Sequence, residues 1–132
     1  MVNHKRLLVV EDDYILAHMY KERFGAEGYE VVSADNGEDG IDEALAGNFD
    51  LVILDLMLPK RGGLSVLQIL RSRPETEKIP VIIITNHPDD RYREIAEKYG
   101  IEDFVFKAEI MPKDVIDRIN KIIKKYDASA FE

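Results

Sequence analysis

The sequence predicts an α/β protein whose core is a parallel β-sheet with helices on both faces. Two observations support this prediction. Four short apolar runs have the length and composition of buried parallel strands, namely residues 7–10, 51–54, 81–84 and 104–106. Segments with apolar residues at helical spacing lie between these runs. Strict alternation of strands and helices produces three layers, because each crossover helix packs on a face of the sheet.

The first half of the chain contains two strand–helix units. Leu7-Leu8-Val9-Val10 is the first strand, and Gly25 and Gly28 end the helix after it. The residues of this helix expected to face inward are Ile15, Leu16, Met19, Tyr20 and Phe24. A second strand is expected over residues 29–33. The next helix ends near Gly47-Asn48, and one of its faces carries Gly40, Ile41, Ala44 and Leu45.

The third strand is the run Leu51-Val52-Ile53-Leu54, and it ends in Asp55. Pro59 and the pair Gly62-Gly63 predict a loop after it. The third helix has one apolar face and is ended by Pro74; that face carries Leu64, Leu67 and Leu70. Pro80 then opens the fourth strand.

The last two units complete the alternation. Asp89 or Asp90 can cap the fourth helix, and Gly100 ends it. Its inward residues are expected to be Tyr92, Ile95, Ala96 and Tyr99. The fifth strand carries Lys107, and Pro112 suits the first turn of the fifth helix. The apolar stripe of that helix is expected to contain Val115, Ile119, Ile122 and Tyr126.

Five such units with right-handed crossovers leave few topologies, and the flavodoxin-like strand order 2-1-3-4-5 is common at this size. The predicted fold is therefore a three-layer, doubly wound (βα)5 sandwich. Residues 1–126 form one domain in this interpretation. Residues 127–132 are expected to be a short tail, with no output domain.

Composition excludes several classes of function. The 132 residues include no cysteine, so disulfides, thiol catalysis and cysteine zinc sites are excluded. A net charge of −8 argues against non-specific nucleic-acid binding. No apolar run reaches the roughly 20 residues of a membrane span. We therefore expect a cytoplasmic protein that binds neither membrane nor nucleic acid.

Polar residues follow the strands at the edge where parallel sheets bind ligands. Glu11 and Asp12 follow the first strand, Asp55 ends the third, Thr85 ends the fourth and Lys107 the fifth. Three carboxylates that meet repel one another unless a cation joins them. Without cysteine, a hard cation such as Mg²⁺ is favoured. An aspartate beside Mg²⁺ can also attack phosphorus and form an aspartyl phosphate.

Together these segments resemble the receiver domain of two-component response regulators. The resemblance covers residues from about Arg6 to Tyr126. It depends on four matches in order: Leu-Val-Val-Glu-Asp-Asp at 8–13, Asp-Leu-Met-Leu-Pro at 55–59 with Gly63 behind it, Thr85, and Asp-Phe-Val-Phe-Lys at 103–107. Each match alone is weak, whereas their combination and spacing are specific.

The resemblance implies a role for each residue. Asp55 would be the phosphoacceptor, and the Mg²⁺ ligands would be Asp12, Asp55, the Met57 carbonyl and, through water, Glu11. Thr85 and Lys107 would bind the phosphoryl group. Thr85 and Phe104 would act as the switch. Asp13 is expected to cap the first helix instead of joining the acidic pair.

The same resemblance implies the partners. A histidine kinase or histidine phosphotransfer protein would donate the phosphoryl group. An unidentified downstream protein would bind the face formed by the fourth helix, fifth strand and fifth helix. The protein would be a self-phosphorylating and self-dephosphorylating switch instead of a turnover enzyme. It would be a monomer or a weak homodimer.

Two alternatives come from other classes. A degenerate receiver would act only as a phosphorylation-independent interaction module. A phosphatase or flavin-binding protein of similar fold is the second alternative. Such phosphatases usually carry Asp-x-Asp, whereas Met57 stands two residues after Asp55, and Glu11-Asp12-Asp13 would repel a flavin phosphate.

The chain departs from the family pattern at two positions. Asn86 follows Thr85 where the family usually has a small residue, and it would line the access to the phosphoryl site. Ala108 follows Lys107 where the family usually has a proline after a cis peptide bond. A cis bond before a residue other than proline costs about 2.5–4 kcal/mol, so we expect a trans Lys107–Ala108 bond.

Overall fold

The computed structural model describes residues 5–87 and 89–129 and confirms the predicted fold class. Five parallel strands form one sheet in the order β2-β1-β3-β4-β5. The elements are β1 (Arg6–Val10), α1 (Tyr14–Ala26), β2 (Glu30–Ala34), α2 (Gly37–Gly47), β3 (Leu51–Asp55), α3 (Gly63–Ser72), β4 (Val81–Thr85), α4 (Asp90–Tyr99), β5 (Asp103–Phe106), the short 3₁₀ helix η1 (Lys107–Glu109) and α5 (Pro112–Ser129).

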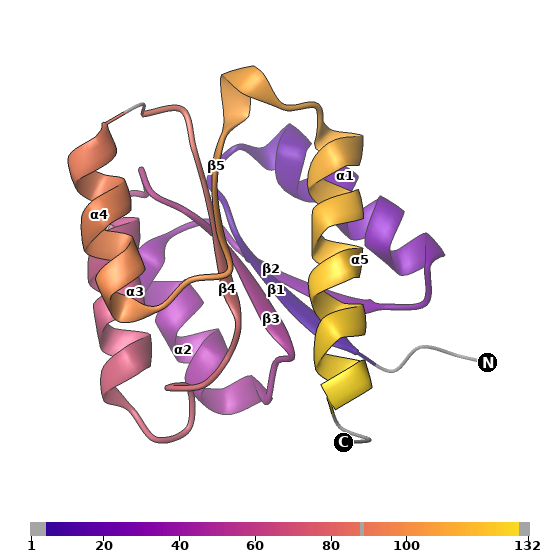
Figure 1. The fold of residues 1–132 in the computed structure, drawn as a ribbon, viewed down its shortest axis with the longest axis horizontal. Coiled ribbons are helices and arrows are strands. Elements are labelled where there is room, and N and C mark those ends of the chain that lie inside the picture. The colour runs from indigo at the N-terminus through magenta and orange to yellow at the C-terminus, as the bar shows by residue number, and fades with distance from the viewer. Residues whose placement is uncertain (1–4, 88, 130–132) are drawn as a thin grey trace.

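Helices cover both faces of the sheet. Helices α1 and α5 lie on one face, and α2, α3 and α4 lie on the other (Figure 1). Alternate residues of each strand enter the two cores, as the pleat of a strand requires. In β1, for example, Leu8 and Val10 belong to the core under α2–α4, and Leu7 and Val9 belong to the core under α1 and α5. Strands β3 and β4 are buried along their whole length.

The strand register brings the carboxyl ends of the central strands together. Val10 lies beside Leu54, Asp55 beside Ile84, and Thr85 beside Phe106. Residues that follow these positions therefore project from one edge of the sheet. The topology thus builds the site, because it aligns residues that are far apart in the sequence.

The inward face was predicted wrongly at three positions. Ile15 is 81% exposed, since it lies two residues, or about 200° around the helix, from the buried Ala17. Ile95 is 40% exposed beside the buried Ala96. Tyr126 is 43% exposed, and its hydroxyl donates to the carboxylate of Glu102. The spacing of apolar residues predicts a helix well but does not determine its rotation toward the sheet.

Several boundaries also differ from the prediction. Strand β2 begins and ends one residue later than expected, and β5 ends at Phe106, so Lys107 begins η1 instead of ending the strand. Helix α5 continues to Ser129 and takes in three residues that were expected to be tail. The Lys107–Ala108 bond is trans, as expected. Across residues 5–87 and 89–129, no helix is long and apolar enough to cross a membrane.

Candidate functional site

Three carboxylates meet at the carboxyl edge of the sheet. Glu11 and Asp12 follow β1, and Asp55 ends β3. One oxygen from each carboxylate lies within 4.8 Å of the others. Glu11 and Asp55 are both 5% exposed, whereas Asp12 faces solvent. The predicted acidic cluster therefore forms, with two buried members and one open to incoming ligands.

Lys107 joins this cluster directly. Its ammonium nitrogen lies 2.6 Å from Oε1 of Glu11 and 3.0 Å from Oδ2 of Asp55. The lysine side chain itself is only 16% exposed. A buried charge is costly unless it is paired, so the lysine and the two acids stabilise one another. One ammonium among three carboxylates still leaves the cluster negative.

The excess of negative charge is reflected in the pKa values. The pKa of Glu11 is raised to about 8: burial and the hydrogen bond with Asp55 raise it, and the hydrogen bond with Lys107 offsets part of this increase. Burial lowers the pKa of Lys107, but its hydrogen bonds to Glu11 and Asp55 outweigh burial and raise it overall. The site therefore favours additional positive charge.

Backbone N–H groups hold the acids in place. Oδ1 of Asp55 accepts a hydrogen bond of 3.0 Å from the N–H of Met57. Oε2 of Glu11 accepts one of 3.1 Å from the N–H of Asp13. Asp13 caps α1, as predicted, because its Oδ1 accepts a hydrogen bond from the N–H of Leu16. These bonds orient the carboxylates before any ligand arrives.

The donor set fits a hard divalent cation. All three side chains offer oxygen, and no cysteine is present in the sequence to offer a thiolate. Mg²⁺ is typically held by one or two carboxylates together with water and phosphate oxygens. Glu11, Asp12 and Asp55 could therefore hold it, with the backbone of the exposed Met57 nearby in the chain. A cation here would also neutralise the remaining negative charge.

Thr85 and Asn86 lie at the neighbouring strand end. Thr85 is fully buried, and its Oγ1 accepts a 2.9 Å hydrogen bond from the N–H of His87. Asn86 follows it and is exposed. The hydroxyl proton of Thr85 is therefore free of this bond and can be donated elsewhere. Thr85 directly follows Ile84, the residue that pairs with Asp55 across β3 and β4, so the hydroxyl lies on the strand next to the carboxyl end of β3 as the sequence predicted.

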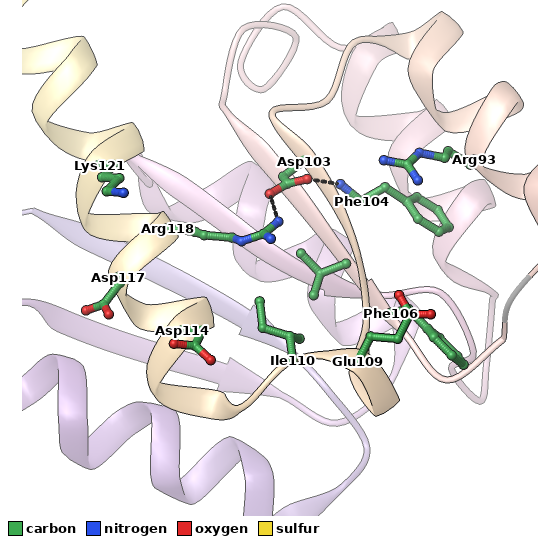
Figure 2. Close-up of a pocket in the computed structure, with 11 residues that line it drawn as sticks. Arg93, Asp103, Phe104, Phe106, Glu109, Ile110, Asp114, Asp117, Arg118 and Lys121 are labelled. Carbon is green, nitrogen blue, oxygen red and sulfur yellow. Dashed lines mark hydrogen bonds and ion pairs between the residues drawn. The ribbon is translucent and has the colours of Figure 1, made fainter.

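Phe104 lies further from the acids, in β5. Its ring packs against the core under α2–α4 and is partly buried. The guanidinium of Arg93, from α4, lies 5.7 Å from the ring centroid (Figure 2). Phe104 therefore connects the sheet to α4.

The first turn of α2 adjoins the site, although it was not among the predicted site residues. Asn36 caps this helix, is 4% exposed, and accepts a hydrogen bond of 2.9 Å from the N–H of Asp39. Gly37 then contacts the loop that follows Asp55. The dipeptide Asn36-Gly37 could have indicated this helix start, but in a sequence Asn-Gly is equally typical of a turn.

Comparisons with known proteins agree with this architecture. A family model of the response regulator receiver domain matches residues 7–120. The response regulator ArlR of Staphylococcus aureus is 34% identical over 120 residues, which cover 91% of this chain and 53% of the relative. The chain therefore spans about half the length of the curated relatives it matches.

Solved structures share the fold. A CheY-like response regulator receiver domain protein from Methanospirillum hungatei JF-1 has a TM-score of 0.88 at 22% identity, covering 96% of this chain and 99% of that chain. The receiver domain of the sensor histidine kinase PA1611 from Pseudomonas aeruginosa PAO1 has a TM-score of 0.77 at 20% identity, covering 93% and 97%. That crystal structure contains a magnesium ion coordinated in the active site cleft.

Proposed function

Because the chain belongs to the response regulator receiver domain family of two-component signalling, we propose that it is a phosphorylation-dependent switch with Asp55 as the phosphoacceptor. One observation carries this proposal. Asp55 lies buried within a cluster of Glu11, Asp12 and Lys107, although these residues come from three different strand ends. Ordinary surface acids would not be buried together beside a lysine.

The chemistry follows from the arrangement. An oxygen of Asp55 attacks the phosphorus of a phosphohistidine, the new O–P bond forms, and the P–N bond breaks with its electron pair left on the imidazole nitrogen. Bound Mg²⁺ would supply positive charge for the phosphoryl oxygens. Lys107, which pairs with Asp55 before the reaction, would then donate to the phosphoryl group. Thr85 offers a hydroxyl donor on the neighbouring strand.

The phosphoryl donor would reach the site across exposed apolar side chains. Tyr14 and Ile15 at the start of α1 are 83% and 81% exposed, and Met57 is 54% exposed. Tyr14 lines a crevice with Asp12, and Met57 lines another with the same aspartate. Large apolar side chains left in solvent around an acidic site are typical of a protein interface. They would contact the histidine kinase or phosphotransfer protein.

Phosphorylation would change the face formed by α4, β5 and α5, where a downstream protein could detect it. Thr85 would keep the hydrogen bond that its Oγ1 accepts from the N–H of His87 and turn its hydroxyl proton toward a phosphoryl oxygen, which would draw the end of β4 toward Asp55. Phe104, packed beside β4, would respond to this movement. The change is a local charge event that biases a two-state element.

The responding face is hollowed and charged. A groove of about 610 Å³ lies between α4, β5 and α5 and is lined by charged side chains with Phe104 and Phe106 at one end (Figure 2). Within it, Asp103 pairs with Arg118 at 2.6 Å and accepts from the N–H of Phe104. A downstream protein bound here would detect movement of Phe104 or Arg93.

Incubation with acetyl phosphate tests the proposed function. We expect intact-mass spectrometry to show one phosphoryl adduct with Mg²⁺ and none with a chelator, because the negative cluster needs a cation before it accepts a phosphoryl group. Amide spectra of the same sample should change along α4, β5 and α5. A degenerate receiver would give no adduct under any condition, and that result would favour the interaction-module alternative.

Asn86→Ala is expected to speed phosphorylation, dephosphorylation or both. The exposed Asn86 amide lies directly after Thr85 and would hinder a donor or an attacking water. A tenfold change would need only about 1.4 kcal/mol of barrier. Adduct formation and decay should be followed by mass spectrometry, with Gln68→Ala as a control that removes an exposed amide from the middle of α3. If neither rate increases, crowding by Asn86 does not limit the chemistry.

A further inference from the structure

The first turn of α2 is hydrogen-bonded to the loop that follows Asp55. The N–H of Gly37 donates to the carbonyl of Pro59, and the N–H of Glu38 donates to the carbonyl of Lys60, both at 3.1 Å. The first four N–H groups of a helix have no partner within the helix. Two of these N–H groups in α2 therefore donate to carbonyl groups of the loop 57–62, which follows Asp55.

The same turn leaves no room for a side chain. A Cβ atom added to Gly37 would lie 2.0 Å from the carbonyl oxygen of Arg61. One turn later, a Cβ atom on Gly40 would lie 2.8 Å from Cγ1 of Val10, the residue before Glu11. Helix α2 therefore contacts both chain segments that carry the acidic cluster.

The loop held in this way has an unfavourable backbone. Lys60 has a φ of 50° and Arg61 a φ of 104°, a region that residues other than glycine rarely adopt. Such conformations persist only where the surroundings hold them. At its other end the loop is closed by the N–H of Gly63, which donates to the carbonyl of Leu56 at 2.8 Å.

We propose that Gly37 is a positioning residue for the phosphoacceptor site. It acts through the loop 57–62: close contact with α2 holds this loop so that Asp55 and the backbone of Met57 are presented to the same cation. The inference rests on the proposed function, since it explains how the site is held in shape before Mg²⁺ and the phosphoryl donor bind.

Gly37→Ala tests this role, with Gly25→Ala in α1 as the matched control. Apart from its chain neighbours and the backbone of α1 itself, no atom of the described residues lies within 4 Å of a Cβ added at Gly25. At Gly37 the distance must grow from 2.0 Å to at least 3.0 Å, so the loop must shift by about 1 Å. Misplacement on that scale costs up to about 100-fold in rate. We expect roughly a tenfold to hundredfold slower adduct formation and weaker Mg²⁺ binding in Gly37→Ala, and wild-type values in Gly25→Ala.

The measurements should be made by calorimetry and mass spectrometry at a temperature where circular dichroism shows all three proteins folded. If Gly37→Ala matches Gly25→Ala while the wild type binds Mg²⁺ and takes one phosphoryl group, the positioning role is refuted and the proposed function stands. If the wild type neither binds Mg²⁺ nor takes a phosphoryl group, both the positioning role of Gly37 and the proposed function are refuted.

A wild-type measurement decides the case even if Gly37→Ala does not fold. During a Mg²⁺ titration followed by amide NMR, the signals of Gly37 and Glu38 should shift, because their acceptor carbonyls belong to the loop. The signal of Gly25 should stay in place. Shifts at Met57 without shifts at Gly37 and Glu38 would refute the coupling.

Discussion

Asp55→Asn is expected to abolish the phosphoryl adduct. The amide keeps the size of the carboxylate but lacks the anionic oxygen that attacks phosphorus. The side chain is 5% exposed and touches Lys107, so the substituted residue should remain in the same pocket. Intact-mass spectrometry after incubation with acetyl phosphate and Mg²⁺ should show only the unmodified protein.

Asp13→Asn is the matched control for this experiment. Asp13 lies next to the acidic cluster but is exposed and caps α1, and asparagine caps helices as well as aspartate does. This variant should therefore form the adduct at the wild-type rate. An undiminished adduct in Asp55→Asn would show that another residue accepts the phosphoryl group, and peptide mapping would then locate it.

Lys107→Ala is expected to impair both stability and chemistry. The ammonium pairs with two buried carboxylates, and removing one partner of a buried ion pair costs about 3–5 kcal/mol. We expect the loss in unfolding free energy to be at the lower end of that range, since the pKa of Glu11 is already raised and Glu11 can take up a proton. Loss of the donor should also slow adduct formation by about 10²-fold, as loss of a preorganised donor does elsewhere.

Chemical denaturation with and without Mg²⁺ separates these effects. Mg²⁺ should stabilise Lys107→Ala more than the wild type, because the cation then binds a more negative cluster. Lys113→Ala is a suitable control, since Lys113 is exposed at the start of α5. Wild-type stability and an equal Mg²⁺ response in Lys107→Ala would contradict the pairing of Lys107 with the acids.

Where the sequence carried a local signal, it predicted the fold well. The run Leu51–Leu54 is short and β-branched in its centre, and it ends in an acid, so it predicted both a buried strand and a residue at the ligand edge. Alternation of such runs with helical spacing predicted five units and the order 2-1-3-4-5. Each of these signals lies within about fifteen residues, the length of one element and its loop.

The rotation of each helix about its axis, and the contacts between residues far apart in the sequence, could be determined only from the tertiary structure. The spacing of Ile15 with Tyr20 and Phe24 predicted α1 correctly, yet Ile15 faces solvent, because packing of α1 on the sheet decides which stripe is buried. Lys107 was predicted to lie near the acids, but its bonds to Glu11 and Asp55 join residues 96 and 52 positions apart.

The contact of Gly37 with Arg61 shows most clearly what the sequence by itself does not determine. Asn36-Gly37 predicts a turn or a helix start, and nothing in its neighbourhood along the chain points to the loop after Asp55. Periodicity and turn chemistry record preferences of neighbouring residues, and these preferences specified the elements and the acids at their ends. The distance between α2 and the loop after Asp55 is set by close packing of two crossovers on one face of the sheet, so only the folded chain decides it.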